Sequence, residues 1–176
     1  MRKRLFFYVF LLLNFIGLTA YAGEIPIGEP IEKNGMQISA VYLQAVLMDP
    51  DMPHTTGPAD IHLEADVRAL KNNPNGFAVG EWVPALQVSY HLTKQGSTWS
   101  QTGTLMPMVA NDGPHYGENV KLNGPGKYRL VFNLKPPPYS GFVRHVDKET
   151  GVGKWWEPFS VNWEFTYIGT GKKGGY

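Results

Sequence analysis

Strict alternation of apolar and polar residues is the feature that most limits what this chain can fold into. The run 61–68 reads Ile-His-Leu-Glu-Ala-Asp-Val-Arg, with an apolar residue at every odd position and a polar one at every even position. Successive side chains of a strand point to opposite faces, so this pattern predicts a strand with one apolar and one polar face. Further extended runs are predicted at 36–48, 86–93, 98–106, 126–134 and 161–167.

Strands with one apolar face need a second layer to cover that face. The chain offers six or seven of them, and the 14 Pro and 20 Gly residues often fall between the alternating runs. No window after the N-terminal segment has a convincing helical period. We therefore expect an all-β protein with an immunoglobulin-like two-sheet β-sandwich, built as a single domain.

Residues 1–22 have the composition of a secretory signal peptide. Three basic residues at 2–4 precede an apolar run that extends to about residue 18, and Ala20-Tyr21-Ala22 matches an A-x-A cleavage site. Cleavage would leave one domain at 23–168 and a flexible tail rich in glycine and lysine at 169–176. No later stretch approaches the roughly 20 apolar residues of a spanning helix, so we expect an exported protein without membrane insertion.

Charge and cysteine content exclude several classes of function. The chain has 16 Lys and Arg residues against 15 Asp and Glu residues, and losing Arg2, Lys3 and Arg4 leaves 13 basic residues. A slightly acidic mature chain lacks the basic surface that a nucleic-acid-binding protein needs. The chain has no cysteine, which excludes disulfides, a blue-copper site, a cysteine-rich zinc site and a cysteine nucleophile.

His62 and Glu64 stand two positions apart on the polar face of the predicted strand 61–68. Their Cα atoms would lie roughly 6.6 Å apart on the same face, and both side chains are long enough to converge on one ion. A solvated outer face is the commoner explanation of a single His/Glu pair. The metal interpretation therefore depends on the other ligand-type residues of the chain.

Methionine and histidine occur together in two segments that are rich in Pro, Gly and Asp. The first holds Met48, Met52 and His54, and the second holds Met106, Met108 and His115. Thioether sulfur selects Cu(I), imidazole binds copper, iron or zinc, and carboxylate accepts harder divalent ions. This mixture predicts a copper site that could also accept Fe(II) or Mn(II) through its nitrogen and oxygen ligands.

Catalysis by side chains alone has weaker support. No serine lies in a nucleophile elbow, and nothing singles out a pair of carboxylates for glycosidic cleavage. Function is expected in the long connections, which are predicted at 48–54, 107–123 and 136–158. The last of these carries Trp155 and Trp156, which could stack against sugars, although core packing or loop anchoring is the commoner role.

Together these segments resemble the periplasmic iron-transport protein family that includes FetP. The resemblance extends from about residue 28 to residue 168. It is carried by Asp60-Ile61-His62-Leu63-Glu64-Ala65-Asp66, by Met108 seven positions before His115 in Asp112-Gly113-Pro114-His115-Tyr116-Gly117, by His145, by Val41-Tyr42-Leu43-Gln44 and by Glu81-Trp82-Val83-Pro84.

The resemblance implies an immunoglobulin-like sandwich, a periplasmic location, a homodimer, and a copper site that supports iron uptake. It also implies an inner-membrane iron permease as the functional partner. A binding protein is expected rather than an enzyme, with copper-dependent oxidation of iron left open. A periplasmic copper chaperone or copper-resistance protein would use the same ligands, and a non-metal module binding through the Trp-rich loops is a third possibility.

The resemblance also implies the metal ligands, which are His62, Glu64, Met108, His115 and His145. The copper shell would contain the three histidines and Met108, while Glu64 would be a nearby or alternate ligand that permits a second metal position for iron or manganese. Strand alternation places Met106 on the same side as Met108, and only the spacing to His115 favours Met108. The segment with Met48, Met52 and His54 is not part of the shared pattern.

Overall fold

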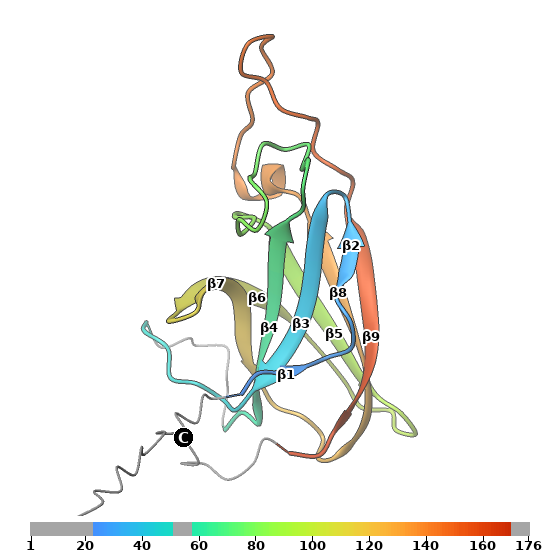
Figure 1. The fold of residues 1–176 in the computed structure, drawn as a ribbon. Coiled ribbons are helices and arrows are strands. Elements are labelled where there is room, and N and C mark those ends of the chain that lie inside the picture. The colour runs from blue at the N-terminus through green and yellow to red at the C-terminus, as the bar shows by residue number, and fades with distance from the viewer. Residues whose placement is uncertain (1–22, 51–57, 170–176) are drawn as a thin grey trace, which may run out of the picture.

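The chain folds into two antiparallel sheets that share one strand. The structure, a computed structural model, describes residues 23–50 and 58–169. Its strands are β1 (Ile25–Pro26), β2 (Ile31–Lys33), β3 (Met36–Leu43), β4 (Ile61–Ala69), β5 (Gln87–Lys94), β6 (Ser100–Ala110), β7 (Gly113–Val120), β8 (Gly126–Lys135) and β9 (Phe159–Tyr167), and a 3-10 turn, η1, covers Pro137–Ser140. The predicted all-β sandwich is confirmed (Figure 1).

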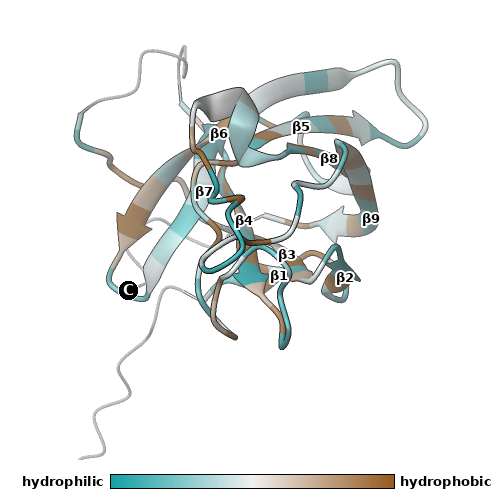
Figure 2. Ribbon diagram, turned by 90° about the horizontal axis from the view of Figure 1, so that it is seen from above, coloured by the Kyte–Doolittle hydropathy of each residue, from teal (hydrophilic) through white to brown (hydrophobic). Residues whose placement is uncertain are grey.

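Strand β6 connects the two sheets. The strand order is β1-β3-β4-β7-β6-β5-β8-β9, with β2 beside β3. Residues 100–105 of β6 pair with β5, whereas residues 106–110 pair with β7. The strand therefore changes sheets between Leu105 and Met106, and the β6–β7 hairpin extends the sheet that contains β4. Seen from above in Figure 2, β3 and β4 lie across the core from β5 and β8.

Alternation in the sequence explains the core. In β4 the predicted inward residues are fully buried, as are those of β8, while Val88, Tyr90 and Leu92 of β5 are at most 2% exposed. The β4 and β8 residues are Ile61, Leu63, Ala65, Val67, Tyr128, Leu130, Phe132 and Leu134. On β9, Trp163 and Tyr167 are buried and Phe165 is half-buried.

The prediction of a long connection at 107–123 is wrong. Strand β6 continues to Ala110, a turn at Asn111-Asp112 follows, and β7 returns along it. Strand β7 lacks the alternation of apolar and polar residues because one of its faces carries His115, Gly117 and Asn119. The connection at 136–158 does contain no strand, and η1 is its only regular element.

Several expectations concern residues that the structure leaves undescribed. The predicted signal peptide, almost all of the predicted tail, Met52 and His54 belong to this group. Within 23–50 and 58–169, no helix is long and apolar enough to cross a membrane.

Candidate metal centre

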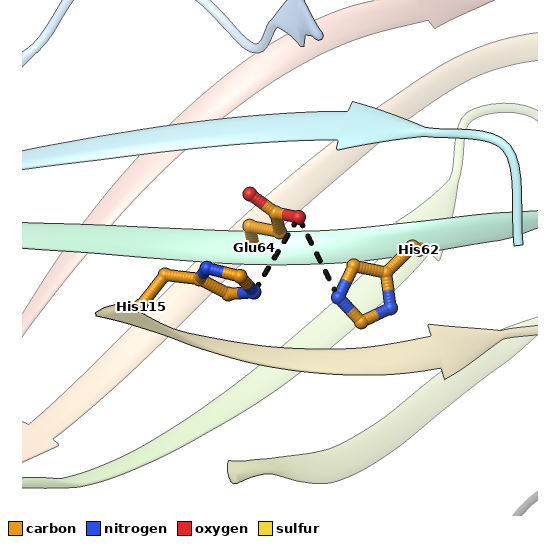
Figure 3. Close-up of side chains that lie close together, drawn as sticks. All are labelled: His62, Glu64 and His115. Carbon is orange, nitrogen blue, oxygen red and sulfur yellow. Dashed lines mark ion pairs between the residues drawn. The ribbon is translucent and has the colours of Figure 1, made fainter. Parts of the chain in front are cut away.

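Three ligand-type side chains from two neighbouring strands meet at one buried point (Figure 3). The Oε1 atom of Glu64 lies 3.5 Å from Nε2 of His62 and 3.6 Å from Nε2 of His115. These three residues are 5%, 1% and 5% exposed, respectively. The distances are too long for good hydrogen bonds, but two donors bound to one ion at about 2 Å each would be roughly 3 to 3.5 Å apart.

Strand register brings these side chains together. Antiparallel pairing sets Glu64 of β4 opposite Gly117 of β7, and His62 opposite Asn119. Across the next pair, Met108 of β6 stands opposite His115. Directly paired residues project to the same face of a sheet. The side chains of His62 and Glu64 therefore lie on the same face of the sheet as that of His115.

Tyr116 anchors β7 from the opposite face. Its side chain is fully buried in the core, and its hydroxyl donates to the carbonyl of Val83 at 2.8 Å and accepts from the N–H of Leu86 at 3.0 Å. Because neighbouring residues of a strand point to opposite faces, a fixed Tyr116 orients His115 and Gly117 toward the cluster.

Met108 joins the cluster through the space that Gly117 leaves. A Cβ atom at position 117 would lie 2.6 Å from Nε2 of His62 and 3.1 Å from Sδ of Met108. Both donor atoms are therefore within about 3 Å of the same empty point, which a side chain would fill. Met106 stands opposite Gly117 on the same edge and is 39% exposed.

Burial keeps Glu64 and His62 uncharged near neutral pH. Desolvation, reinforced by the carboxylates of Glu24, Asp66 and Asp112, raises the pKa of Glu64 to about 8. Desolvation also lowers the pKa of His62 to about 4, and this effect outweighs the hydrogen bond that the ring makes to Oδ1 of Asn119. A neutral imidazole has a free nitrogen lone pair, which is the form that binds a metal ion.

The residues present fit a metal ion. Nε2 of His115 is buried and has no hydrogen-bond partner within the described parts of the chain, which is uncommon for a buried polar atom. The donor atoms of two imidazoles and one carboxyl lie within 4.8 Å of one another, and the thioether of Met108 and Nε2 of His62 border the same open space at Gly117. This mixed set suits copper better than a hard cation.

A cavity of about 830 Å³, here called the outer cavity, opens onto the cluster. Its walls come from the segment that follows β3 and from the β6–β7 hairpin. Met48, singled out by its sequence, lines this cavity together with Leu47, Val109 and Asp112. A path from solvent to the buried donors therefore exists, with a second thioether along it.

A smaller pocket of about 260 Å³, here called the acidic pocket, adjoins the same cluster. It shares Glu64 and His115 with the outer cavity and adds Asp66, while Glu24 and Asp112 line both. Burial and a hydrogen bond with Asp112 raise the pKa of Glu24, which shows how closely the carboxyl groups are packed. Alternation along β4 could have identified Asp66, but Glu24 reaches the site only through folding.

The structure does not bring His145 to the other four residues within one chain. Its side chain is 72% exposed, and its Nδ1 lies 2.8 Å from Oγ1 of Thr150 in the same loop. The segment 141–158 extends past the arrowhead of β4, whereas His62 and Glu64 lie near the beginning of that strand (Figure 1).

Comparison with known proteins identifies the family. The model of the family described as Fe2+ transport protein matches residues 21–169. The UPF0423 protein of Brucella abortus is 56% identical over 161 residues, covering 89% of this chain and 88% of that protein. The 34 kDa membrane antigen of Treponema pallidum is 39% identical, covering 80% and 72%.

Two solved structures are similar over their whole length. Copper-reconstituted P19 protein from Campylobacter jejuni has a TM-score of 0.80 and 52% identity, and the match covers 85% of this chain and 99% of P19. A copper-bound variant of FetP from uropathogenic Escherichia coli has a TM-score of 0.79 and 48% identity, with 84% and 99% covered. With the predicted resemblance confirmed, the chain belongs to the Fe2+ transport protein family.

Proposed function

We propose that this protein is a periplasmic copper-binding protein that supports iron uptake through an inner-membrane permease. The observation that carries the proposal is the buried cluster of His62, Glu64 and His115, with the thioether of Met108 across the open space at Gly117 from Nε2 of His62. The copper in the P19 and FetP structures, at about half identity, supports the choice of metal. Another FetP structure comes from protein expressed in the periplasm, which supports the location.

In this proposal, Nε2 of His62, Nε2 of His115 and Sδ of Met108 hold the copper ion. Bound copper would supply reversible one-electron exchange, and sulfur ligation favours its reduced state. The protein groups hold the ion away from bulk water, since both histidines are at most 5% exposed. The outer cavity provides the approach for a second reactant.

His145 would complete this shell from a second copy of the chain. The Thr150 hydroxyl donates to Oδ2 of Asp147 at 2.7 Å, so it accepts from Nδ1–H of His145 and leaves Nε2 of that ring free to bind. A free imidazole nitrogen on an exposed loop suits a ligand that is offered to another molecule. A homodimer would thus build each site from both chains.

Exposed apolar residues support the same arrangement. Phe142, Val143 and Val146 flank His145 and are 42%, 83% and 74% exposed. At the rim of the outer cavity, Leu47 and Val109 are fully or mostly exposed. Docking of the loop of one copy on the rim of the other would remove both apolar groups from water.

Iron or manganese would bind at an overlapping position in the acidic pocket. Hard divalent cations prefer carboxylate oxygen, and Glu24, Asp66 and Asp112 supply it beside the shared Glu64. An incoming iron ion would thus sit next to the copper position without displacing its sulfur ligand. The family description supports a role in iron transport, and delivery of the iron to a permease is the step proposed here.

The test is metal analysis after exposure of purified protein to equimolar Cu(II), Fe(III), Mn(II) and Zn(II). Wild-type protein should retain copper selectively, and His115→Ala should lose it. His91→Ala, on β5 of the other sheet, is the matched control and should retain copper like wild type. Equal copper in His115→Ala, or none in wild type, would contradict the proposal.

A copper chaperone or copper-resistance protein is the second candidate. The position of Met48 on the wall of the outer cavity favours it, since a thioether on the entry path can pass Cu(I) inward. Cells that lack the protein should grow poorly under iron limitation if the first function holds. Poor growth only under copper excess would indicate the second.

A further inference from the structure

Asn119 contacts both the candidate metal centre and the wall of the outer cavity. It stands opposite His62 in the β4–β7 register, and its Oδ1 lies 3.0 Å from Nδ1 of that ring. The same side chain pairs with the backbone of Val46: its Oδ1 accepts the Val46 N–H at 3.2 Å, and its Nδ2 donates to the Val46 carbonyl at 2.7 Å.

The backbone of Val46 determines which way the amide of Asn119 points. A backbone N–H only donates and a carbonyl only accepts, so the amide oxygen must face the N–H and the amide nitrogen must face the carbonyl. This removes the usual ambiguity of an asparagine amide. The group that faces His62 is therefore the oxygen.

An amide oxygen facing Nδ1 determines the tautomer of the ring. Because that oxygen can only accept, Nδ1 of His62 carries the proton, and Nε2 carries the lone pair. Nε2 is the atom that lies near Glu64 and beside the empty point at Gly117. The ring is thus prepared to bind at the nitrogen that faces the cluster.

The two hydrogen bonds between Asn119 and the backbone of Val46 hold a segment without strand structure. Residues 44–50 belong to no strand, and Leu47, Met48 and Asp49 line the outer cavity. The two-point pairing at Val46 supplies the kind of tie that a neighbouring strand would otherwise give.

We propose that Asn119 is a positioning residue that fixes the tautomer of His62 and ties the Met48 segment to the metal centre with the same amide. The inference rests on the proposed metal site. One side chain would then fix the tautomer of His62 and the position of the segment that carries Met48. Hydrogen-bond partners of this kind raise metal affinity by about 10- to 100-fold in other sites.

Two substitutions separate the two roles. Asn119→Asp retains an oxygen for Nδ1–H of His62 but places a second acceptor against the Val46 carbonyl, so it should release the segment and keep the tautomer. Asn119→Leu has a similar size and removes both contacts. Asn133→Leu on β8 is the matched control, since its partner is the exposed Ser160.

The tautomer and the segment are measured on metal-free protein. Long-range 1H–15N NMR should show protonated Nδ1 on His62 in wild type, in Asn119→Asp and in the control, and a tautomer mixture in Asn119→Leu. Amide exchange at Val46 should be roughly fivefold faster or more in both Asn119 variants. Copper affinity should fall roughly tenfold or more in Asn119→Leu.

Protonated Nε2 in wild type, or an unchanged tautomer in folded Asn119→Leu, would overturn the inference. If Asn119→Leu does not fold, Asn119→Asp decides alone: unchanged exchange at Val46, or loss of the Nδ1–H tautomer, would overturn it. Failure of wild type to bind copper would contradict the proposed function instead, and the metal-free measurements would still decide the role of Asn119.

Discussion

Gly117 of β7 stands directly opposite Glu64 of β4, and its missing side chain leaves an open space beside β4 and β6. Nε2 of His62 and Sδ of Met108 both border that space. The backbone of Gly117 does not adopt the left-handed conformation, so φ does not require glycine there. The close approach of the His62 ring requires it, because a Cβ at position 117 would lie 2.6 Å from Nε2 of that ring.

Gly117→Ala should therefore block the metal centre and leave the fold intact. The added Cβ would lie 2.6 Å from Nε2 of His62, which is closer than unbonded atoms approach, and the ring would have to move. We expect copper affinity to fall by at least about tenfold, measured by competition with a chelator of known affinity. Metal-free thermal unfolding serves as the control for folding, and undiminished affinity would show that the empty point is not the metal position.

Met108→Leu should weaken Cu(I) binding more than Cu(II) binding. The substitution keeps size and apolar character but removes the thioether, a ligand that prefers the softer ion. Met106→Leu is the matched control two residues away on the same strand, opposite Gly117 and 39% exposed. Titration of each variant with both oxidation states would check this, and an equal effect of the two substitutions would assign the sulfur ligand to neither residue alone.

Most of the fold could be predicted because its strands bury one face. Strands β4, β5, β8 and β9 have the alternation that a half-buried strand requires, and the core follows from it. Strand β7 escaped prediction because His115, Gly117 and Asn119 on one face serve the site, so no apolar-polar alternation remains.

The candidate site could be predicted only in part. His62 and Glu64 were visible as a pair two residues apart on one strand. Met108 and His115 were visible as members of a Met/His cluster, and the family resemblance selected them from the other methionines and histidines. The contributions of Gly117, Asn119 and Glu24 exist only through strand pairing and chain folding. Gly117 and Asn119 act on His62, more than 50 positions earlier, and Glu24 acts on Asp112, more than 80 positions later. No local pattern signals such contacts.

Mixing two inactive variants should restore copper binding if His145 acts in the partner subunit. His62→Ala lacks a ligand of its own site, and His145→Ala lacks the ligand that it would offer to the other chain. After denaturation and joint refolding, a mixed dimer would contain one complete site, so about one copper per mixed dimer should return. Binding that stays absent in the mixture, although each variant refolds and dimerises, would place all ligands in one chain or exclude His145.

Asp66→Asn should weaken Mn(II) binding roughly tenfold and leave copper affinity nearly unchanged. Asp66 lines the acidic pocket but not the outer cavity, and removing one carboxylate lowers the charge available to a hard cation. Glu164→Gln, which is exposed on β9, controls for the loss of one negative charge. Calorimetric titration with each metal would check this, and parallel losses for both metals would mean that the two positions share Asp66.

The metal-free protein should lose stability as pH rises from about 6.5 to 8, because Glu64 must ionise while buried. Its pKa is about 8 in the folded chain against 4.5 ordinarily, so the unfolded state releases its proton first, and the stability that is present below pH 4.5 is lost by about pH 8. His62 acts in the opposite direction, with a folded pKa of about 4 against 6.5, and its contribution is lost as pH falls below 6.5.

The two effects oppose each other between pH 4.5 and 6.5, so the interval above 6.5 separates the effect of Glu64 from that of His62. There the free energy of unfolding should fall by up to about 1.4 kcal/mol per pH unit. Glu64→Gln keeps the shape but cannot ionise, and it should flatten this slope, while Glu149→Gln on the exposed loop should leave it as in wild type. Urea unfolding in the presence of a chelator measures the slopes. A wild-type slope equal to that of Glu64→Gln would mean that Glu64 is already ionised in the folded protein, and the neutral cluster derived from its burial would be wrong.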